Sequence, residues 1–293
     1  MRPVMLACWP GMGNVALGAI NYLRRNLAMQ AFAQINTAEF YTPDSIIVED
    51  GIAELPPPPK SIFYFRLKPD LIVLENEVQF GGWAGAKFAR EIVNFAQELG
   101  VSRIFTGAAF PIPSSYREKV RLFGVANMKS GLDLLVRHRI KVMEEGSISG
   151  LNGLILGYAQ EKAIEAICIL ATMPIYATGF PNPRAWKALA EALAQILQVN
   201  INFTELDNQI QQVDARMEQI EEHLQKILEQ REKPAEEETT EDGISQYILN
   251  KIERLFQEAK TNREKALELK KELDRWGLFE MYEDRFLDLF KKD

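Results

Sequence analysis

The sequence has few cysteines and histidines and no long apolar run without charge. Its 293 residues include the cysteines Cys8 and Cys168 and the histidines His138 and His223. Two cysteines cannot build a disulfide framework, and these four side chains are too few for the usual Cys/His zinc sites. No run of about 18 apolar residues occurs, and no cleavable signal pattern opens the chain. We therefore expect a cytoplasmic protein with no metal, no cofactor and no membrane contact.

The chain also lacks a concentrated basic surface. Its net charge is −7, and residues 205–293 hold 24 acidic and 15 basic side chains, which leaves the preceding part near neutral. Proteins that bind nucleic acids usually carry clustered Lys and Arg, and the short basic runs at 117–121 and 137–141 are typical of solvated faces. No nucleic-acid partner is expected.

The first 200 residues alternate short apolar segments with longer amphipathic ones, which is typical of an α/β domain. We predict an exposed strand pair at 45–53, and a left-handed Gly100 after the helix at 83–99. The other predicted strands are 4–9, 30–36, 61–67, 71–75, 103–109, 121–126 and 164–171, and the other helices are 14–27, 129–137, 151–161 and 183–197. The composition changes near residue 200, so we predict a core domain over 1–200 and an acidic helical extension over 201–293.

The extension begins with apolar residues spaced alternately three and four apart, the pattern of a coiled-coil seam. The helix would be roughly 40 Å long, so we expect its seam to pair with another helix, in this chain or in a second subunit. The eight seam residues are therefore partner-binding candidates. They are Phe203, Leu206, Ile210, Val213, Met217, Ile220, Leu224 and Ile227.

A second apolar stripe follows an acidic break at 232–242 and runs from Ile248 to Trp276. Two long helices joined by a polar turn favour an antiparallel hairpin, and pairing between subunits is the alternative. After Gly277, apolar residues at 279, 282, 286 and 289 predict a short terminal helix. We expect it to pack on the hairpin, with a partner-docking peptide as the alternative.

The turn after the first strand carries the strongest enzyme-like pattern. Gly11-x-Gly13-x-x-Ala16 fits a relaxed dinucleotide-binding fingerprint, with Glu39 as a possible ribose-binding acid. Short glycine patterns also arise by chance, and close packing of a helix on the sheet explains them equally well. No Gly-x-x-x-x-Gly-Lys-Ser/Thr sequence occurs, which excludes a P-loop.

Acidic residues at a strand end form a second candidate. Glu75 and Glu77 follow an apolar strand and are expected to share one face, with Asn76 on the other. Neither cysteine has a general base nearby in sequence, so we assign no catalytic residue and expect inert buried thiols. Together with Asn152, a helix-cap candidate at 146–153, these features define one candidate pocket. Its residues are Gly11, Gly13, Asn14, Glu75, Glu77 and Asn152.

Several segments resemble the family of the second proteasome assembly chaperone and its prokaryotic relatives. The resemblance spans roughly residues 3–225, through the segments 4–14, 70–79, 104–109 and 169–172, and its most specific element is 149–154, Ser-Gly-Leu-Asn-Gly-Leu. It implies a three-layer α/β core similar to the phosphorylase/hydrolase-like folds, with a helical extension. It also implies frequent homo-oligomerisation and assembly-chaperone activity without catalysis.

One departure from the family pattern concerns the last residues. Members that dock on a proteasome ring often end in a hydrophobic residue, a tyrosine and any residue, whereas this sequence reads Phe290-Lys291-Lys292-Asp293. Ring docking of that type is therefore not expected. The sequence predicts a non-catalytic, self-associating protein that binds subunits of a protein complex. The alternative is a small-molecule or nucleotide-binding protein, or an enzyme, with its pocket at the first strand–helix turn.

Overall fold

The computed structural model divides the chain into two compact units, Met1–Glu221 and Glu222–Asp293. It describes residues 2–232, 246–261 and 263–290, except the side chains of 224–232, 246–247, 261 and 263–264. Each unit has an apolar core of its own. The composition predicted a boundary at residue 200, and the structure instead groups the residues up to 221 with the first unit.

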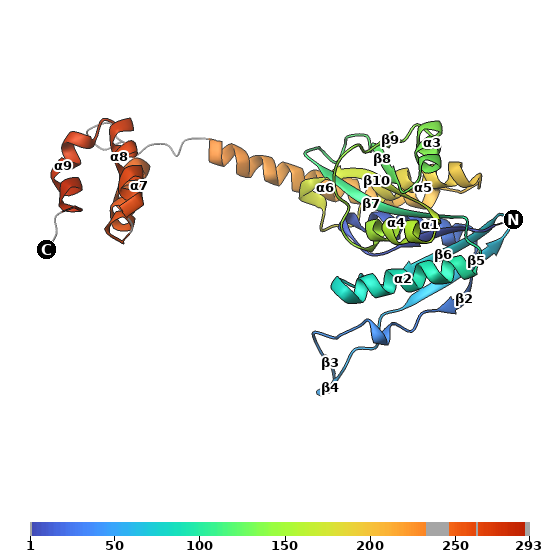
Figure 1. Ribbon diagram of the computed structural model, residues 1–293. Coiled ribbons are helices and arrows are strands. Elements are labelled where there is room, and N and C mark those ends of the chain that lie inside the picture. The colour runs from blue at the N-terminus through green and yellow to red at the C-terminus, as the bar shows by residue number, and fades with distance from the viewer. Residues whose placement is uncertain (1, 233–245, 262, 291–293) are drawn as a thin grey trace. The chain divides into compact units, whose positions relative to one another are not determined.

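The first unit is built on an eight-stranded mixed sheet with the order β2-β5-β6-β1-β7-β10-β8-β9 (Figure 1). The four central strands β6, β1, β7 and β10 run parallel. β5 is antiparallel to both β2 and β6, and β8 is antiparallel to β10 but parallel to β9. The bounds are β1 Val4–Cys8, β2 Gln30–Gln34, β5 Ser61–Leu67, β6 Asp70–Asn76, β7 Arg103–Ile112, β8 Leu122–Ala126, β9 Lys141–Val142 and β10 Glu165–Pro174. The sequence did not predict β9, since a two-residue strand carries no period.

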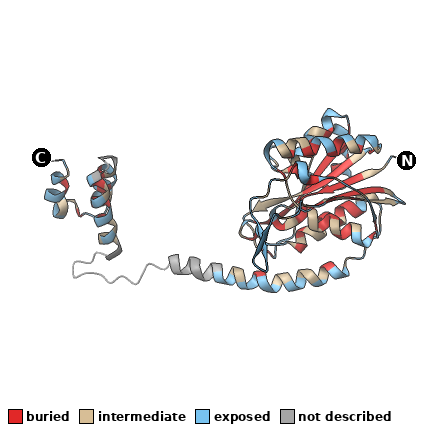
Figure 2. Ribbon diagram, turned by 90° about the horizontal axis from the view of Figure 1, so that it is seen from below, coloured by how far each residue is buried: buried red, intermediate tan, exposed pale blue. Residues whose placement is uncertain are grey.

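Helices cover both faces of the sheet, which gives three layers (Figure 2). On one face lie α1 Val15–Asn26, α3 Lys129–Arg137 and α5 Pro183–Leu197. On the other lie α2 Gly82–Glu98 and α4 Leu151–Glu161. Parallel strands between two helical layers need apolar side chains on both sides. Accordingly every residue of β10 is buried, and the predicted three-layer α/β class is confirmed.

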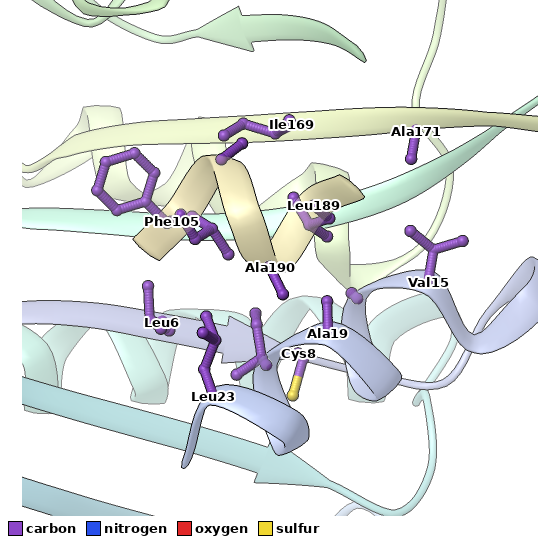
Figure 3. Packing of buried hydrophobic residues seen from close by; sticks show 14 of the residues in the cluster. Leu6, Cys8, Val15, Ala19, Leu23, Phe105, Ile169, Ala171, Leu189 and Ala190 are labelled. Carbon is purple, nitrogen blue, oxygen red and sulfur yellow. The ribbon is translucent and has the colours of Figure 1, made fainter. Parts of the chain in front are cut away.

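α1 and α5 pack closely over the centre of the sheet. Figure 3 shows Ala19 and Leu23 of α1 and Leu189 of α5 packed with Leu6 and Phe105 from the strands. The helices approach each other at Gly18, where an added Cβ would overlap the ring of Trp186. The indole Nε1 of Trp186 donates a hydrogen bond to the Gly13 carbonyl at 2.7 Å. The close contact of these two helices therefore also holds the turn after β1.

The seam predicted for a coiled coil begins just before α6, Thr204–Glu232, and continues along this helix. Most of its described residues pack within the first unit. Phe203, Val213, Met217 and Ile220 join the core beside α1 and α5, and Leu206 is fully buried. The expectation that the seam needs another long helix was wrong as far as residue 220. Heptad spacing shows that a helix has an apolar stripe but does not show what covers it. The side chains of the last two seam residues, 224 and 227, lie outside the described set.

Polar contacts fix α6 on the first unit along the same stretch. Arg184 Nε donates to Asp214 at 2.7 Å, and Lys187 Nζ lies 2.5 Å from an Asp207 oxygen. The backbone N–H of Tyr116 donates to Glu221 at 2.9 Å. These partly buried pairs set the helix register, while the buried apolar stripe supplies most of the stabilisation.

The second unit contains α7 Gln246–Thr261, α8 Arg263–Arg275 and α9 Phe279–Asp288. The single stripe predicted over 248–276 is divided between α7 and α8, which pack against each other through Leu255, Phe256 and Leu269. The predicted long second helix was therefore wrong, and the polar turn at 233–242 lies outside the described residues. The terminal helix is confirmed, because Phe286 of α9 is buried in the same cluster.

The segment between β2 and β5 forms a separate hairpin of β3 Ile47–Glu49 and β4 Ile52–Glu54, as predicted. It is a two-stranded sheet distinct from the large one, and it extends away from the layered body in Figure 1. Every residue of both strands is exposed. Within the described residues, no helix is long and apolar enough to cross a membrane.

The contact at Gly18 can be tested with two glycine substitutions inside helices. Gly18→Ala should lower the free energy of unfolding by about 1–3 kcal/mol, because the new methyl group overpacks Trp186. Gly157→Ala in α4 is the control: a Cβ there meets nothing within 4 Å, so it should instead stabilise by roughly 0.5–1 kcal/mol through helix propensity. Urea unfolding measures both, and equal effects would contradict the close contact.

Candidate functional site

The carboxyl ends of the parallel strands form the candidate site. β1 lies between β6 and β7; the chain leaves β1 through α1 on one face and leaves β6 through α2 on the other. In α/β sheets, ligand-binding crevices form where connections part in this way. A cavity of about 570 Å³ opens here, between the turn after β1, the end of β7 and the loop before α4. We call it the edge cavity.

The edge cavity is mostly apolar and has no charged side chain among its described lining residues. Trp9, Met12 and Phe110 supply apolar walls, and Ser147 and Ser149 add hydroxyl groups. A cavity of this size and composition suits an uncharged ligand better than a phosphate, which would need a cation or free backbone N–H groups.

Asn152 ties three elements together at the floor of the edge cavity. Its Oδ1 accepts hydrogen bonds from the Trp9 N–H at 3.2 Å and from the Thr106 hydroxyl at 3.1 Å, and its Nδ2 donates to the Trp9 carbonyl at 3.3 Å. Gln79 makes a similar bridge, since its Oε1 accepts from the Leu151 N–H at 2.8 Å and its Nε2 donates to the Pro10 carbonyl. Asn152 therefore joins β1, β7 and α4. The prediction that it caps the helix was wrong, because the N-cap is Gly150 and no side chain caps α4.

The indole of Trp9 leaves one polar atom without a partner. Trp9 is fully buried and lines the edge cavity, and its Nε1 has no hydrogen-bond partner among the described residues. An unpaired buried N–H costs roughly 1–3 kcal/mol.

The predicted pocket is divided between two separate cavities. Gly11 and Asn152 line the edge cavity, whereas Asn14, Glu75 and Glu77 line a second cavity of about 430 Å³ beside α1. The Glu75 carboxylate pairs with Arg24 at 2.7 Å and accepts from Asn21 at 3.1 Å. Glu77 accepts from the Lys60 N–H at 2.7 Å. Both carboxylates are thus held by the fold.

The glycine turn uses its own backbone groups within the fold. The Gly13 N–H donates to the Thr178 carbonyl at 2.9 Å, and the Asn14 N–H donates to Gly11 at 2.8 Å. Gly13 has a φ of 61° and lines neither cavity in the described part of the chain. The amides that would hold a pyrophosphate are therefore already bonded, which argues against the dinucleotide interpretation.

Other residues that the sequence raised as chemical candidates lie in structural positions. The exposed Glu39 side chain pairs with Lys87 at 3.1 Å and lines neither cavity in the described part. Burial raises the pKa of Cys168 to about 12 and also raises the pKa of Cys8, so neither thiol forms a reactive thiolate near neutral pH. Among the described residues, no three His, Cys, Asp or Glu side chains gather closely enough to hold a metal ion.

Exposed apolar side chains surround the same edge of the sheet. Met12 follows β1, Trp83 begins α2, Leu154 lies in the first turns of α4, and Ile175 and Phe180 follow β10. We call these five residues the edge surface. Trp83 is 75% exposed and Ile175 53%. Large apolar side chains that gather at one end of a domain mark interaction surfaces more often than isolated ones do.

Comparison with known proteins identifies the chain's relatives. A sequence model of the PAC2 family matches residues 5–221. The chain belongs to the PAC2 family. MJ1210, an uncharacterized protein of Methanocaldococcus jannaschii, is 27% identical over 203 residues, which cover 68% of this chain and 76% of that protein. The suspected family resemblance is confirmed.

Solved structures share the PAC2 fold. PbaA of Pyrococcus furiosus, an archaeal homolog of proteasome-assembly chaperone, superposes with a TM-score of 0.62 at 20% identity, covering 79% of this chain and 92% of its own. PbaB of the same organism, an archaeal proteasome activator, has a TM-score of 0.64 at 22% identity and covers 75% and 93%. A PAC2 family protein of Streptomyces avermitilis has a TM-score of 0.61 at 22% identity and covers 74% and 95%.

In this PAC2 protein, sequence reasoning missed Gln79 and the unpaired Trp9 indole. Gln79 follows the acidic pair that drew attention to β6, and a single amide side chain matches no recognisable motif. The unpaired state of an indole depends on what surrounds it in space. The edge surface was also missed, because its five residues come from four distant segments and have no common period.

The role of Asn152 predicts a stability effect. Asn152→Ala should lower the free energy of unfolding by about 1–3 kcal/mol, because it leaves the Trp9 backbone and the Thr106 hydroxyl without partners inside the protein. Asn94→Ala, on the exposed side of α2, is the control and should be neutral or slightly stabilising. Urea denaturation compares them, and an unaffected Asn152→Ala variant would show that the bridge is not needed.

Proposed function

We propose that this PAC2 protein is a non-catalytic, self-associating, assembly-chaperone-like protein that binds subunits of a protein complex through its edge surface. The observation that carries the proposal is the distribution of exposed apolar side chains. Thirteen large apolar side chains are exposed on the described part of the first unit, and ten of them lie on the edge surface, on the hairpin of β3 and β4 or directly beside that hairpin. Both features stand at the carboxyl edge of the sheet.

The polar residues of the same region support a binding role in place of catalysis. The carboxylates, amides and glycine amides that could act on a substrate are bonded to the fold, as at Glu75, Asn152 and Gly13. A catalytic site needs titratable groups free to exchange protons with a substrate. The edge surface instead offers apolar area around a neutral cavity, which suits the side chains of another protein.

The relatives favour partners in protein assembly. PbaA is described as an archaeal homolog of proteasome-assembly chaperone and PbaB as an archaeal proteasome activator. By this likeness we propose that the present chain binds proteasome-type or similar complex subunits in the cytoplasm. We place subunit binding on the edge surface, because exposed apolar side chains gather there.

The proposal predicts a loss of subunit binding when the edge surface is altered. The full chain is crosslinked in its native host, captured proteins are identified, and each complex subunit found is purified and titrated against the chain. Trp83→Ser should raise the Kd of such a subunit at least tenfold, a loss of about 1.4 kcal/mol or more. Val136→Ser on α3 is the control, since Val136 is 65% exposed and lies apart from the edge.

Two results would overturn this function. One is capture of no subunit of any complex, and the other is an equal Kd for Trp83→Ser and the wild type. Binding to free subunits but not to the finished complex identifies an assembly chaperone. Binding to the finished complex alone would instead indicate an activator.

A second candidate function, binding of an uncharged small molecule in the edge cavity, is favoured by the cavity's volume of about 570 Å³ and its mostly apolar lining. It predicts a saturable rise in melting temperature with adenosine or guanosine, and a smaller one with their 5′-monophosphates, because no cation lines the described cavity. Ser149→Trp, on the exposed loop at the cavity, should abolish the rise. Equal shifts for nucleosides and monophosphates, or no shift, would count against this function.

A further inference from the structure

The hairpin of β3 and β4 has one wholly apolar face. Val48 pairs with Ala53, and the two flanking pairs are Ile47 with Glu54 and Glu49 with Ile52. Because successive strand residues point to opposite faces, Val48 and Ala53 share one face, and the same alternation places Ile46 and Leu55 on it at the open end of the hairpin. Val48 is 61% exposed and Leu55 70%. The opposite face alternates isoleucine with glutamate.

The hairpin has a regular tight turn, although all residues of its two strands are exposed. Asp50 and Gly51 at its turn both have positive φ, 50° and 81°, as the tight turns that match strand twist require. A two-stranded hairpin by itself is marginal in water. An apolar face of this kind is stabilised when another surface covers it.

An apolar groove lies at the opposite edge of the large sheet, near the end of β5 and the start of β6. It has a volume of about 370 Å³ and opens beside the β5–β6 turn. Phe32 is 41% exposed there and Leu67 71%. In the described part of the first unit, three large exposed apolar residues lie away from the carboxyl edge of the sheet, and Phe32 and Leu67 are two of them. Its apolar lining consists of Pro3, Phe32, Phe65, Leu67, Leu71, Ile72 and Leu99.

The hairpin and the groove have complementary charges. Residues 44–54 contain four acidic and no basic side chains. At the groove, Arg66 lines the wall and the exposed Lys68 follows it, against one acid, Asp70. Opposite charges around matching apolar patches guide association and fix its register.

Within one chain, the hairpin and the groove lie at opposite ends of β5. The hairpin precedes Ser61 at the start of β5, and the groove lies at Leu67, where β5 ends. Seven extended residues span roughly 20 Å. A hairpin docked in this groove would therefore come from a second molecule.

We propose that the apolar face of the hairpin docks in the groove of a second copy of this chain, head to tail. The two surfaces differ, so the contact is heterologous and each copy can bind two neighbours, which builds a ring or an open chain. This inference rests on the self-association in the proposed function and names its interface. It is independent of subunit binding by the edge surface.

The first test compares the two faces of the hairpin. By light scattering on the full chain, Val48→Asp should reduce the mass to that of the monomer, because the charge would be buried in an apolar groove. Ile52→Asp is the matched control: it lies on the mixed face, is 64% exposed, and should keep the wild-type mass. Both variants should keep the melting temperature of the body.

The second test uses complementation. Leu67→Asp, on the exposed turn beside the groove, should also give a monomer. Mixed with Val48→Asp in equal amounts, it should form a dimer and nothing larger, since one intact hairpin and one intact groove remain. Either variant alone should stay monomeric at the same total concentration.

Each opposite outcome overturns the assignment. An unchanged mass for Val48→Asp, or an equal loss for Ile52→Asp, removes the hairpin face from the interface. An unchanged mass for Leu67→Asp, or no dimer in the mixture, shows that the hairpin contacts something other than the groove. A monomeric wild-type chain would overturn self-association itself, while the Trp83→Ser titration would still decide subunit binding.

Discussion

The burial of β1 between two helical layers is the constraint on which the other features depend. All its residues except Val4 are buried, so the chain must leave the strand in a tight turn that starts a helix on one face only. Trp186 covers that turn, and Asn152 holds the end of the strand from the other face. These contacts use the Gly13 carbonyl and the Trp9 N–H, and the Gly13 N–H donates to Thr178. The turn therefore serves the fold, and the crevice beside it is neutral.

Because the sheet is buried on both sides, the apolar residues available for binding lie on the loops and helix starts around it. Helices that bury the sheet on both sides hide its apolar residues, and the apolar side chains that stay exposed come from the loops and helix starts at the carboxyl edge. Loops held by a rigid scaffold commonly carry the binding residues of a domain. In this PAC2 protein the same edge supports both the hairpin and the edge surface, so the proposed self-association and the proposed subunit binding would use different residues.

α6 shows that one apolar sequence pattern is compatible with two kinds of packing. Met217 and Val213 follow a heptad seam, yet they pack on α1 and α5 of their own unit. A stripe three to four residues apart is buried equally well by another helix or by a domain surface. Which surface covers it depends on long-range geometry, and here a charged pair such as Arg184 with Asp214 helps to set the register.

The sequence alone determined the element types of the core, because strand and helix periods and turn glycines such as Gly100 are local signals. It also placed Asn152 and the glycine turn near a site. Only the tertiary structure decided that Glu75 and Asn152 belong to different cavities, and that the seam on α6 closes its own unit. The reason is physical: a period records which side of an element is apolar, whereas the neighbour that covers this side depends on residues far away in the chain.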